Sequence, residues 1–63
     1  MKREALLRHL RGQGCFLKRE GSQHSLWENP ITGEVEAVPR HTEVDNCLAR
    51  SICRRLGVPP VGR

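Results

Sequence analysis

One histidine stands out as a residue that could do chemistry. The segment GSQHSLW, residues 21–27, places His24 where a glycine-containing turn leads into an apolar run, and the cations Lys18 and Arg19 precede it. An imidazole changes its charge near neutral pH, so a positioned histidine can act there as a general acid or base. The ordinary alternative is a surface or turn histidine, and the position of His24 alone does not decide between the two.

The sequence lacks the patterns of several other chemistries. It contains no P-loop, no His-Glu-x-x-His motif and no carboxylate pair at a spacing that suggests joint acid–base work. The cysteines Cys15, Cys47 and Cys53 form no Cys-x-x-Cys pair, whereas zinc ligands usually come in closely spaced pairs. We therefore expect structural, mostly buried thiols and neither a metal nor a cofactor. A zinc site that adds His9 and His41 to these thiols is the weaker alternative.

The chain is strongly basic for its length. Eleven lysines and arginines against seven acidic residues give the 63 residues a net charge of +4. Such an excess favours a polyanionic partner, and Arg50, Arg54 and Arg55 form a basic cluster near the end of the chain. Charge alone does not choose among RNA, DNA and an acidic protein. Basic helix faces that are only solvated are the alternative.

Hydrophobic periodicity predicts an opening helix and three strands. A helix is expected over residues 2–11, where Leu6, Leu7 and Leu10 share one face before glycines end it. Short strands are expected at residues 15–20, 24–28 and 34–38. A tight connection joins the first two strands, and a turn containing Pro30 and Gly33 precedes the third, which Pro39 ends. An antiparallel meander follows from these short connections.

A second helix is predicted near the end of the chain. Its apolar face consists of Leu48, Ile52 and Leu56. Gly57 ends this helix. Its start has two candidates: Thr42 as the cap with Asp45 three residues on, or Asn46 as the cap of a helix that begins at Cys47.

The order helix, three strands, helix predicts an α+β domain, α-β-β-β-α, with a three-stranded antiparallel sheet. Both helices need an apolar surface, so we expect them on one face of the sheet. The expected core is Leu6, Leu7, Leu10, Phe16, Leu17, Leu26, Trp27, Val35, Val38, Leu48, Ile52 and Leu56, with Ala5 and Ala49 filling gaps. Residues 1–58 form the expected domain and 59–63 a short tail. The chain shows no signal segment or membrane-spanning run, so we expect a cytoplasmic protein without a membrane partner.

In order and spacing, several motifs resemble those of the HicA-type toxins. They are Gly-x-x-His-x-x-aromatic (Gly21, His24, Trp27), Pro-x-x-Gly (Pro30, Gly33), Val-Pro-Arg-His (residues 38–41) and Leu-x-x-x-Ile (Leu48, Ile52). The opening helix and the start of the first strand are similar as well, so the resemblance covers nearly the whole chain. The chain departs from the family at Gln23, where a serine is common, and at Asn46-Cys47, where the family usually has Gly or Thr.

The resemblance implies a fold like that of double-stranded-RNA-binding domains, His24 as the catalytic residue, messenger RNA as the substrate and a HicB-type antitoxin as the partner. RNA carries its own nucleophile in the 2′-hydroxyl, so one imidazole suffices for cleavage without a metal. The residues expected to contact the substrate are Lys18, Arg19, Gly21, Ser22, Arg40, Arg54 and Arg55. The cations among them would stabilise charge on the phosphorus.

Two other functions fit the same sequence. A non-catalytic RNA-binding module of the same fold is the main alternative, and a domain that docks an acidic protein is the third.

His41 is expected to cap the second helix rather than touch substrate. His9 is expected to be solvated, and Trp27 to pack in the core rather than stack on a base.

Overall fold

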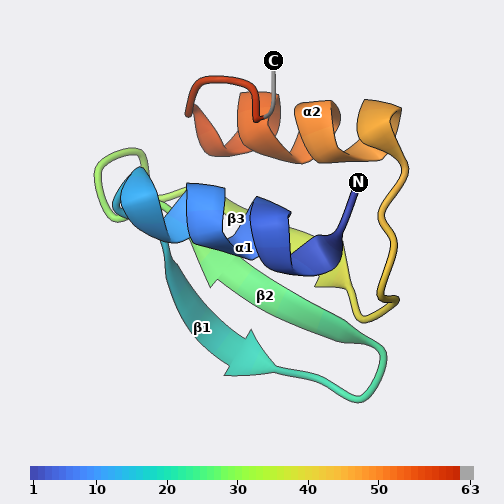
Figure 1. Cartoon of the computed structure of the whole chain (residues 1–63). Coiled ribbons are helices and arrows are strands. Elements are labelled where there is room, and N and C mark those ends of the chain that lie inside the picture. Colours follow the sequence, from blue (N-terminus) through green and yellow to red (C-terminus); the bar gives the residue numbers. More distant parts are fainter. Residues whose placement is uncertain (62–63) are drawn as a thin grey trace.

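The computed structural model describes residues 1–61 and has the predicted order of elements (Figure 1). They are α1 (Arg3–Gly12), β1 (Phe16–Glu20), β2 (His24–Glu28), β3 (Val35–Pro39) and α2 (Asn46–Leu56). The strands form one antiparallel sheet in the order β1-β2-β3. The α-β-β-β-α prediction is confirmed. Of the predicted tail, residues 62–63 lie outside the described residues.

The predicted bounds of α1 and of the three strands are right to within one residue. Pro39 is the last residue of β3 rather than the first beyond it, and it pairs with His24. A proline is tolerated there because β3 is an edge strand, and backbone N–H groups on the outer side of an edge strand have no partner strand. Within residues 1–61, neither helix is long and apolar enough to cross a membrane.

The core lies between the two helices and one face of the sheet. Its buried apolar side chains are Leu6, Leu7, Leu10, Cys15, Trp27, Val38, Val44, Ala49, Ile52, Cys53, Leu56 and Val58. From the sheet, only alternate residues of β2 and β3 are buried, namely Ser25, Trp27 and Val38. Both helices therefore pack on the same face, and Figure 1 shows them on the same side of the sheet.

Five residues of the expected core lie outside it: three are exposed, and Leu26 and Val35 are half-buried on the face of the sheet that carries no helix. Phe16, Leu17 and Leu48 are 44%, 46% and 38% exposed. All five residues of β1 are exposed because this edge strand extends beyond the cover of the helices. Its pairing with β2 also contains an irregularity between Leu17 and Arg19. The apolar pattern identified these residues correctly as apolar but did not show how far the helices reach.

The start of α2 differs from both predicted caps. The carboxylate of Asp45 accepts hydrogen bonds from the backbone N–H groups of Cys47 (3.0 Å) and Leu48 (3.2 Å), so Asp45 is the N-cap. Neither Thr42 nor Asn46 has that role. At the other end Gly57 adopts the left-handed conformation, with φ of 78°, as predicted.

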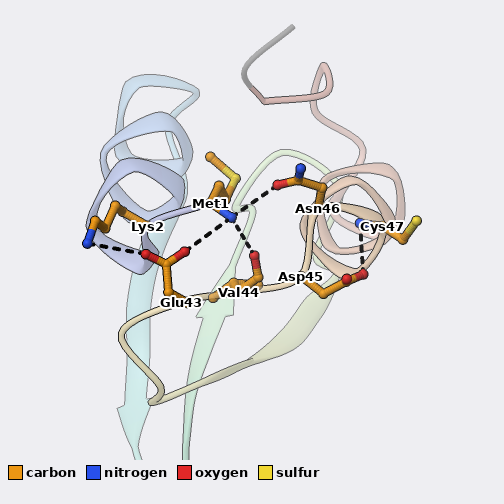
Figure 2. A network of polar contacts seen from close by, with 7 residues as sticks. All are labelled: Met1, Lys2, Glu43, Val44, Asp45, Asn46 and Cys47. Carbon is orange, nitrogen blue, oxygen red and sulfur yellow. Dashed lines mark hydrogen bonds and ion pairs between the residues drawn. The ribbon is translucent and has the colours of Figure 1, made fainter.

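The first residues of the chain tie the start of α1 to the segment before α2 (Figure 2). The ammonium group of Met1 donates to the carbonyl of Val44 (2.8 Å) and to Oδ1 of Asn46 (3.1 Å). It also lies 3.5 Å from the carboxylate of Glu43, which pairs with Lys2 at 3.2 Å. The hydrogen bond from Lys2, aided by the two positive charges, lowers the pKa of Glu43 against a smaller opposing effect of desolvation.

Candidate functional site

His24 is the first residue of β2, and its side chain is exposed. Successive residues of a strand point to opposite faces. Because Ser25 and Trp27 point into the core, His24, Leu26 and Glu28 point to the face that carries no helix. The imidazole is thus presented to solvent by a strand whose other face is fixed by packing.

The turn that leads into His24 requires a glycine. The backbone N–H of Gly21 donates to the carbonyl of His24 over 2.8 Å and closes the turn. A Cβ added to Gly21 would lie 2.8 Å from that same oxygen, closer than real Cβ atoms approach. Gly21 was expected among the substrate-contacting residues. The structure gives it a backbone role next to His24.

A chain of polar contacts holds both ends of this turn. Nη2 of Arg3 donates to the hydroxyl of Ser25 (2.8 Å), which donates to Oε1 of Glu20 (2.9 Å). The other oxygen of Glu20 lies 2.7 Å from Nη1 of Arg40. That same nitrogen donates to the carbonyl of Gly21 over 2.9 Å. One network therefore connects α1, β1, β2 and the segment after β3 around the turn.

No role was predicted for Arg3, Glu20 or Ser25 from the sequence. Arg3 also donates from Nε to the carbonyl of Pro39 over 2.8 Å, so it binds the ends of two strands. Ser25 is only 1% exposed. Its position gave the one available signal, because a small polar residue that alternates with Trp27 on the buried face needs a polar partner.

Two hollows adjoin His24. One, of about 330 Å³, is lined by Arg19, Gly21, Ser22, Gln23, His24 and Leu26. The other, of about 290 Å³, is lined by Ser22, Gln23, His24, Pro39, Arg40 and His41. Each hollow is thus lined by His24 and by one arginine, Arg19 in the first and Arg40 in the second. An acid–base group flanked by cations can move a proton at a phosphate ester and stabilise its charge.

The predicted site residues divide into two groups. Arg19, Gly21, Ser22 and Arg40 are brought together around His24. The others are not, namely Lys18, Arg54 and Arg55.

Each of these outlying cations has a definite location. Lys18 pairs with Glu28, at the opposite end of β2 from His24, over 3.6 Å. Arg54 and Arg55 lie in the last turn of α2, and the carbonyl of Leu56 there accepts from Asn29, which follows β2, over 2.8 Å. Arg55 also pairs with Glu36 over 3.7 Å. The last turn of α2 therefore lies near the end of β2 that is remote from His24.

The remaining candidate side chains have mainly structural environments. Trp27 is 2% exposed, with the guanidinium of Arg11 5.2 Å from its ring centre. His9 was expected to be solvated, but its Nε2 lies 2.7 Å from the carbonyl oxygen of Pro59 and forms a hydrogen bond to the tail. His41 is exposed and borders the second hollow. Because Asp45 caps α2, the capping role expected for His41 is wrong.

The three thiols do not share one environment. Cys15 and Cys53 are buried and Cys47 is exposed, so the expectation of mostly buried thiols is met by two of them. Burial raises the pKa of both the Cys15 and the Cys53 thiol. Among residues 1–61, no three His, Cys, Asp or Glu side chains gather in a way that could hold a metal ion.

Comparison of the chain with protein-family models, with curated proteins and with solved structures finds no match. The HicA resemblance therefore stays a prediction from the sequence. The site around His24 has to be interpreted from its own geometry.

Proposed function

We propose that this chain is an endoribonuclease toxin of the HicA type, in which His24 performs acid–base chemistry on messenger RNA. The observation that supports this proposal is that the exposed His24 borders two hollows, each of which is also lined by an arginine. The closed turn at Gly21 and the polar network beside it hold the backbone of the strand end that carries His24.

In the proposed reaction the RNA 2′-hydroxyl attacks the adjacent phosphorus. The O2′–P bond forms and the P–O5′ bond breaks, leaving a 2′,3′-cyclic phosphate and a 5′-hydroxyl. His24 takes the proton of the attacking hydroxyl or gives one to the leaving oxygen, and water exchanges the other proton. Arg19 and Arg40, the latter bonded to Glu20 and Gly21 only through Nη1, stabilise the negative charge on the phosphoryl oxygens. No residue forms a covalent bond to the substrate.

The proposal includes a HicB-type antitoxin and a cytoplasmic location. Blocking the reactive imidazole is the simplest way to neutralise such a protein, so the antitoxin covers His24 and its hollows. Acidic side chains on the antitoxin would complement the net charge of +4 and speed the encounter. A complex in which His24 stays open to solvent would contradict this mode of inhibition.

Replacing His24 tests the catalytic role. His24→Ala should lower cleavage of RNA by roughly 10²–10⁴-fold and abolish growth arrest. The fold should be kept, because the side chain is exposed. His24→Gln should fail equally, since an amide exchanges no proton near neutral pH. The matched control is His41→Ala, which removes the other imidazole of the second hollow and should retain most activity.

Substrate variants test the chemistry itself. RNA with hydrogen in place of the 2′-hydroxyl at the cleaved bond should resist cleavage, and chelators should have no effect on the cleavage rate. If His24→Ala cuts RNA at the unmutated rate in a nuclease-free preparation, the assignment is wrong and His41 becomes the candidate.

The second candidate function is a non-catalytic RNA-binding module. It is favoured by Arg19 in the first hollow, which makes no ion pair among residues 1–61 and can bind a phosphate without any chemistry at His24. An unmutated protein that binds RNA and never cuts it would establish this function instead.

A further inference from the structure

The face of the sheet opposite the helices forms a continuous surface, here called the open face. Residues paired across antiparallel strands point to the same side, and the pairs Phe16–Glu28, Arg19–Leu26 and His24–Pro39 extend the face of His24 across the sheet. Its side chains are Phe16, Lys18, Arg19, His24, Leu26, Glu28, Val35, Ala37 and Pro39.

Every side chain of the open face retains exposure to solvent. On the other face, the corresponding residues Ser25, Trp27 and Val38 are 2% exposed or less. In the part of the chain that the structure describes, no helix lies over the open face, and both helices lie on the other side (Figure 1). The difference leaves a mixed apolar and basic surface without cover.

The chemistry of the open face changes along β2. His24 lies at one end, and Phe16, 44% exposed, lies beside Glu28 at the other. Lys18 pairs with Glu28 and so neutralises the carboxylate of this face. Arg19 lies between the two ends and, among residues 1–61, makes no ion pair. It also lines the hollow next to His24.

An exposed aromatic ring and an unpaired guanidinium fit one class of nucleic acid. Single-stranded RNA offers the flat faces of its bases for stacking and its phosphates for ion pairing, whereas a duplex hides the base faces. Phe16 lies beside Glu28, four residues along β2 from His24. At the rise per residue of a strand, this corresponds to about 13 Å. A few nucleotides of an extended strand span that distance.

We propose that the open face binds single-stranded RNA, with the phosphate of the bond held at His24 on Arg19 and a base stacked on Phe16 a few nucleotides away. The proposal deepens the proposed function and rests on it for the placement of the cut bond. The binding itself is measurable without cleavage. An RNA strand on this face runs along the sheet and leaves the basic end of α2 uncovered.

The test measures binding of a short unstructured RNA by fluorescence anisotropy in the His24→Ala background, so that no substrate is consumed. Phe16→Ala should raise the Kd about tenfold, within the range for loss of one base–aromatic stack. Phe16→Trp should restore it. The matched control is Ile31→Ala, an apolar side chain 87% exposed in the turn before β3, which should leave the Kd unchanged.

Two further comparisons locate the contacts. Arg19→Gln should weaken binding and reduce its salt dependence by about one phosphate contact, whereas Arg8→Gln, which removes an equal charge from the exposed side of α1, should not. An RNA lacking the stacked base should bind the unmutated and the Phe16→Ala protein equally, because the two changes remove the same contact. Melting temperatures confirm that each variant is folded.

The outcomes separate this inference from the proposed function. Unchanged affinity in both Phe16→Ala and Arg19→Gln, or tighter binding of a blunt RNA duplex than of the single strand, overturns the open-face proposal even if His24 proves catalytic. Binding that depends on Phe16 in a protein that never cuts RNA supports the open face and removes the nuclease. Loss of antitoxin binding in Phe16→Ala with RNA affinity unchanged would assign the face to a protein partner and likewise overturn the proposal.

Discussion

The two faces of β2 have opposite roles although their residues alternate along one strand. His24 is exposed beside its hollows, while Ser25, the next residue, is 1% exposed and bonded to Arg3 and Glu20. The covered face supplies the packing that defines the strand, and the open face carries the candidate chemistry. Substitutions on the covered face should therefore act mainly on stability, and those on the open face mainly on function.

The separation is incomplete at one place. The hydroxyl of Ser25 begins a set of contacts that passes through Glu20 to Arg40 and ends on the carbonyl of Gly21. Through that set the covered face fixes the turn on which the open face depends.

The largest expected effect is on stability at Trp27. Trp27→Ala should cost about 3–5 kcal/mol, as truncation of a buried aromatic side chain does, because this residue is 2% exposed in the core. Leu26→Ala is the matched control on the open face of the same strand and should cost far less. Urea denaturation followed by circular dichroism measures both. Equal destabilisation by the two variants would show that the open face is also packed.

The next largest effect is expected on the rate of RNA cleavage when Gly21 is replaced. Gly21→Ala should lower the rate on the order of 100-fold, as a small misplacement of a catalytic group can, because the added Cβ pushes against the carbonyl of His24. Gly12→Ala, where no atom lies within 4 Å of the added Cβ, should retain the rate and stabilise α1 slightly. Single-turnover rates with saturating protein separate this effect from weaker binding. A Gly21→Ala protein with full activity would mean that the turn does not position His24.

The smallest effect is expected on the acid dependence of stability when Glu43 is replaced. Its pKa is lowered in the folded protein, so its contacts with Lys2 and Met1 stabilise the fold above the ordinary carboxyl range and are lost as the pH falls through that lowered pKa. The melting temperature of Glu43→Gln should therefore fall less between neutral and acid pH than that of the unmutated protein. The difference should be small because the ion pair is exposed. Thermal melts over that pH range measure it. An unchanged acid dependence would show that these ion pairs contribute nothing.

Local patterns were sufficient to predict the fold. The bounds of β2 were predicted to the residue, because glycine and proline turns flank a short alternating run. The exposure of Phe16 and Leu48 was not predictable, since apolar character does not show which surfaces two short helices can cover. The Asp45 cap was missed among several polar residues that can each cap a helix.

The sequence predicted only the part of the candidate site whose residues are close together along the chain. His24 with Arg19, Gly21 and Ser22 lie close in sequence, so one turn brings them together. The contact of Arg3 with Ser25 joins residues 22 positions apart, and no local pattern encodes it. Arg54 and Arg55 formed a basic cluster in the sequence, yet the direction of α2 carries them away from His24.

The irregular pairing of β1 also bears on how copies of this protein behave at high concentration. A three-stranded sheet has two edges, and an exposed edge can recruit a strand from another molecule into an aggregate. On β1 the register shift between Leu17 and Arg19 and the charges of Lys18 and Arg19 make a poor template for a new strand. On β3 the ring of Pro39 removes a donor at the end of the edge. The open face can thus remain uncovered for a ligand while both edges discourage self-association.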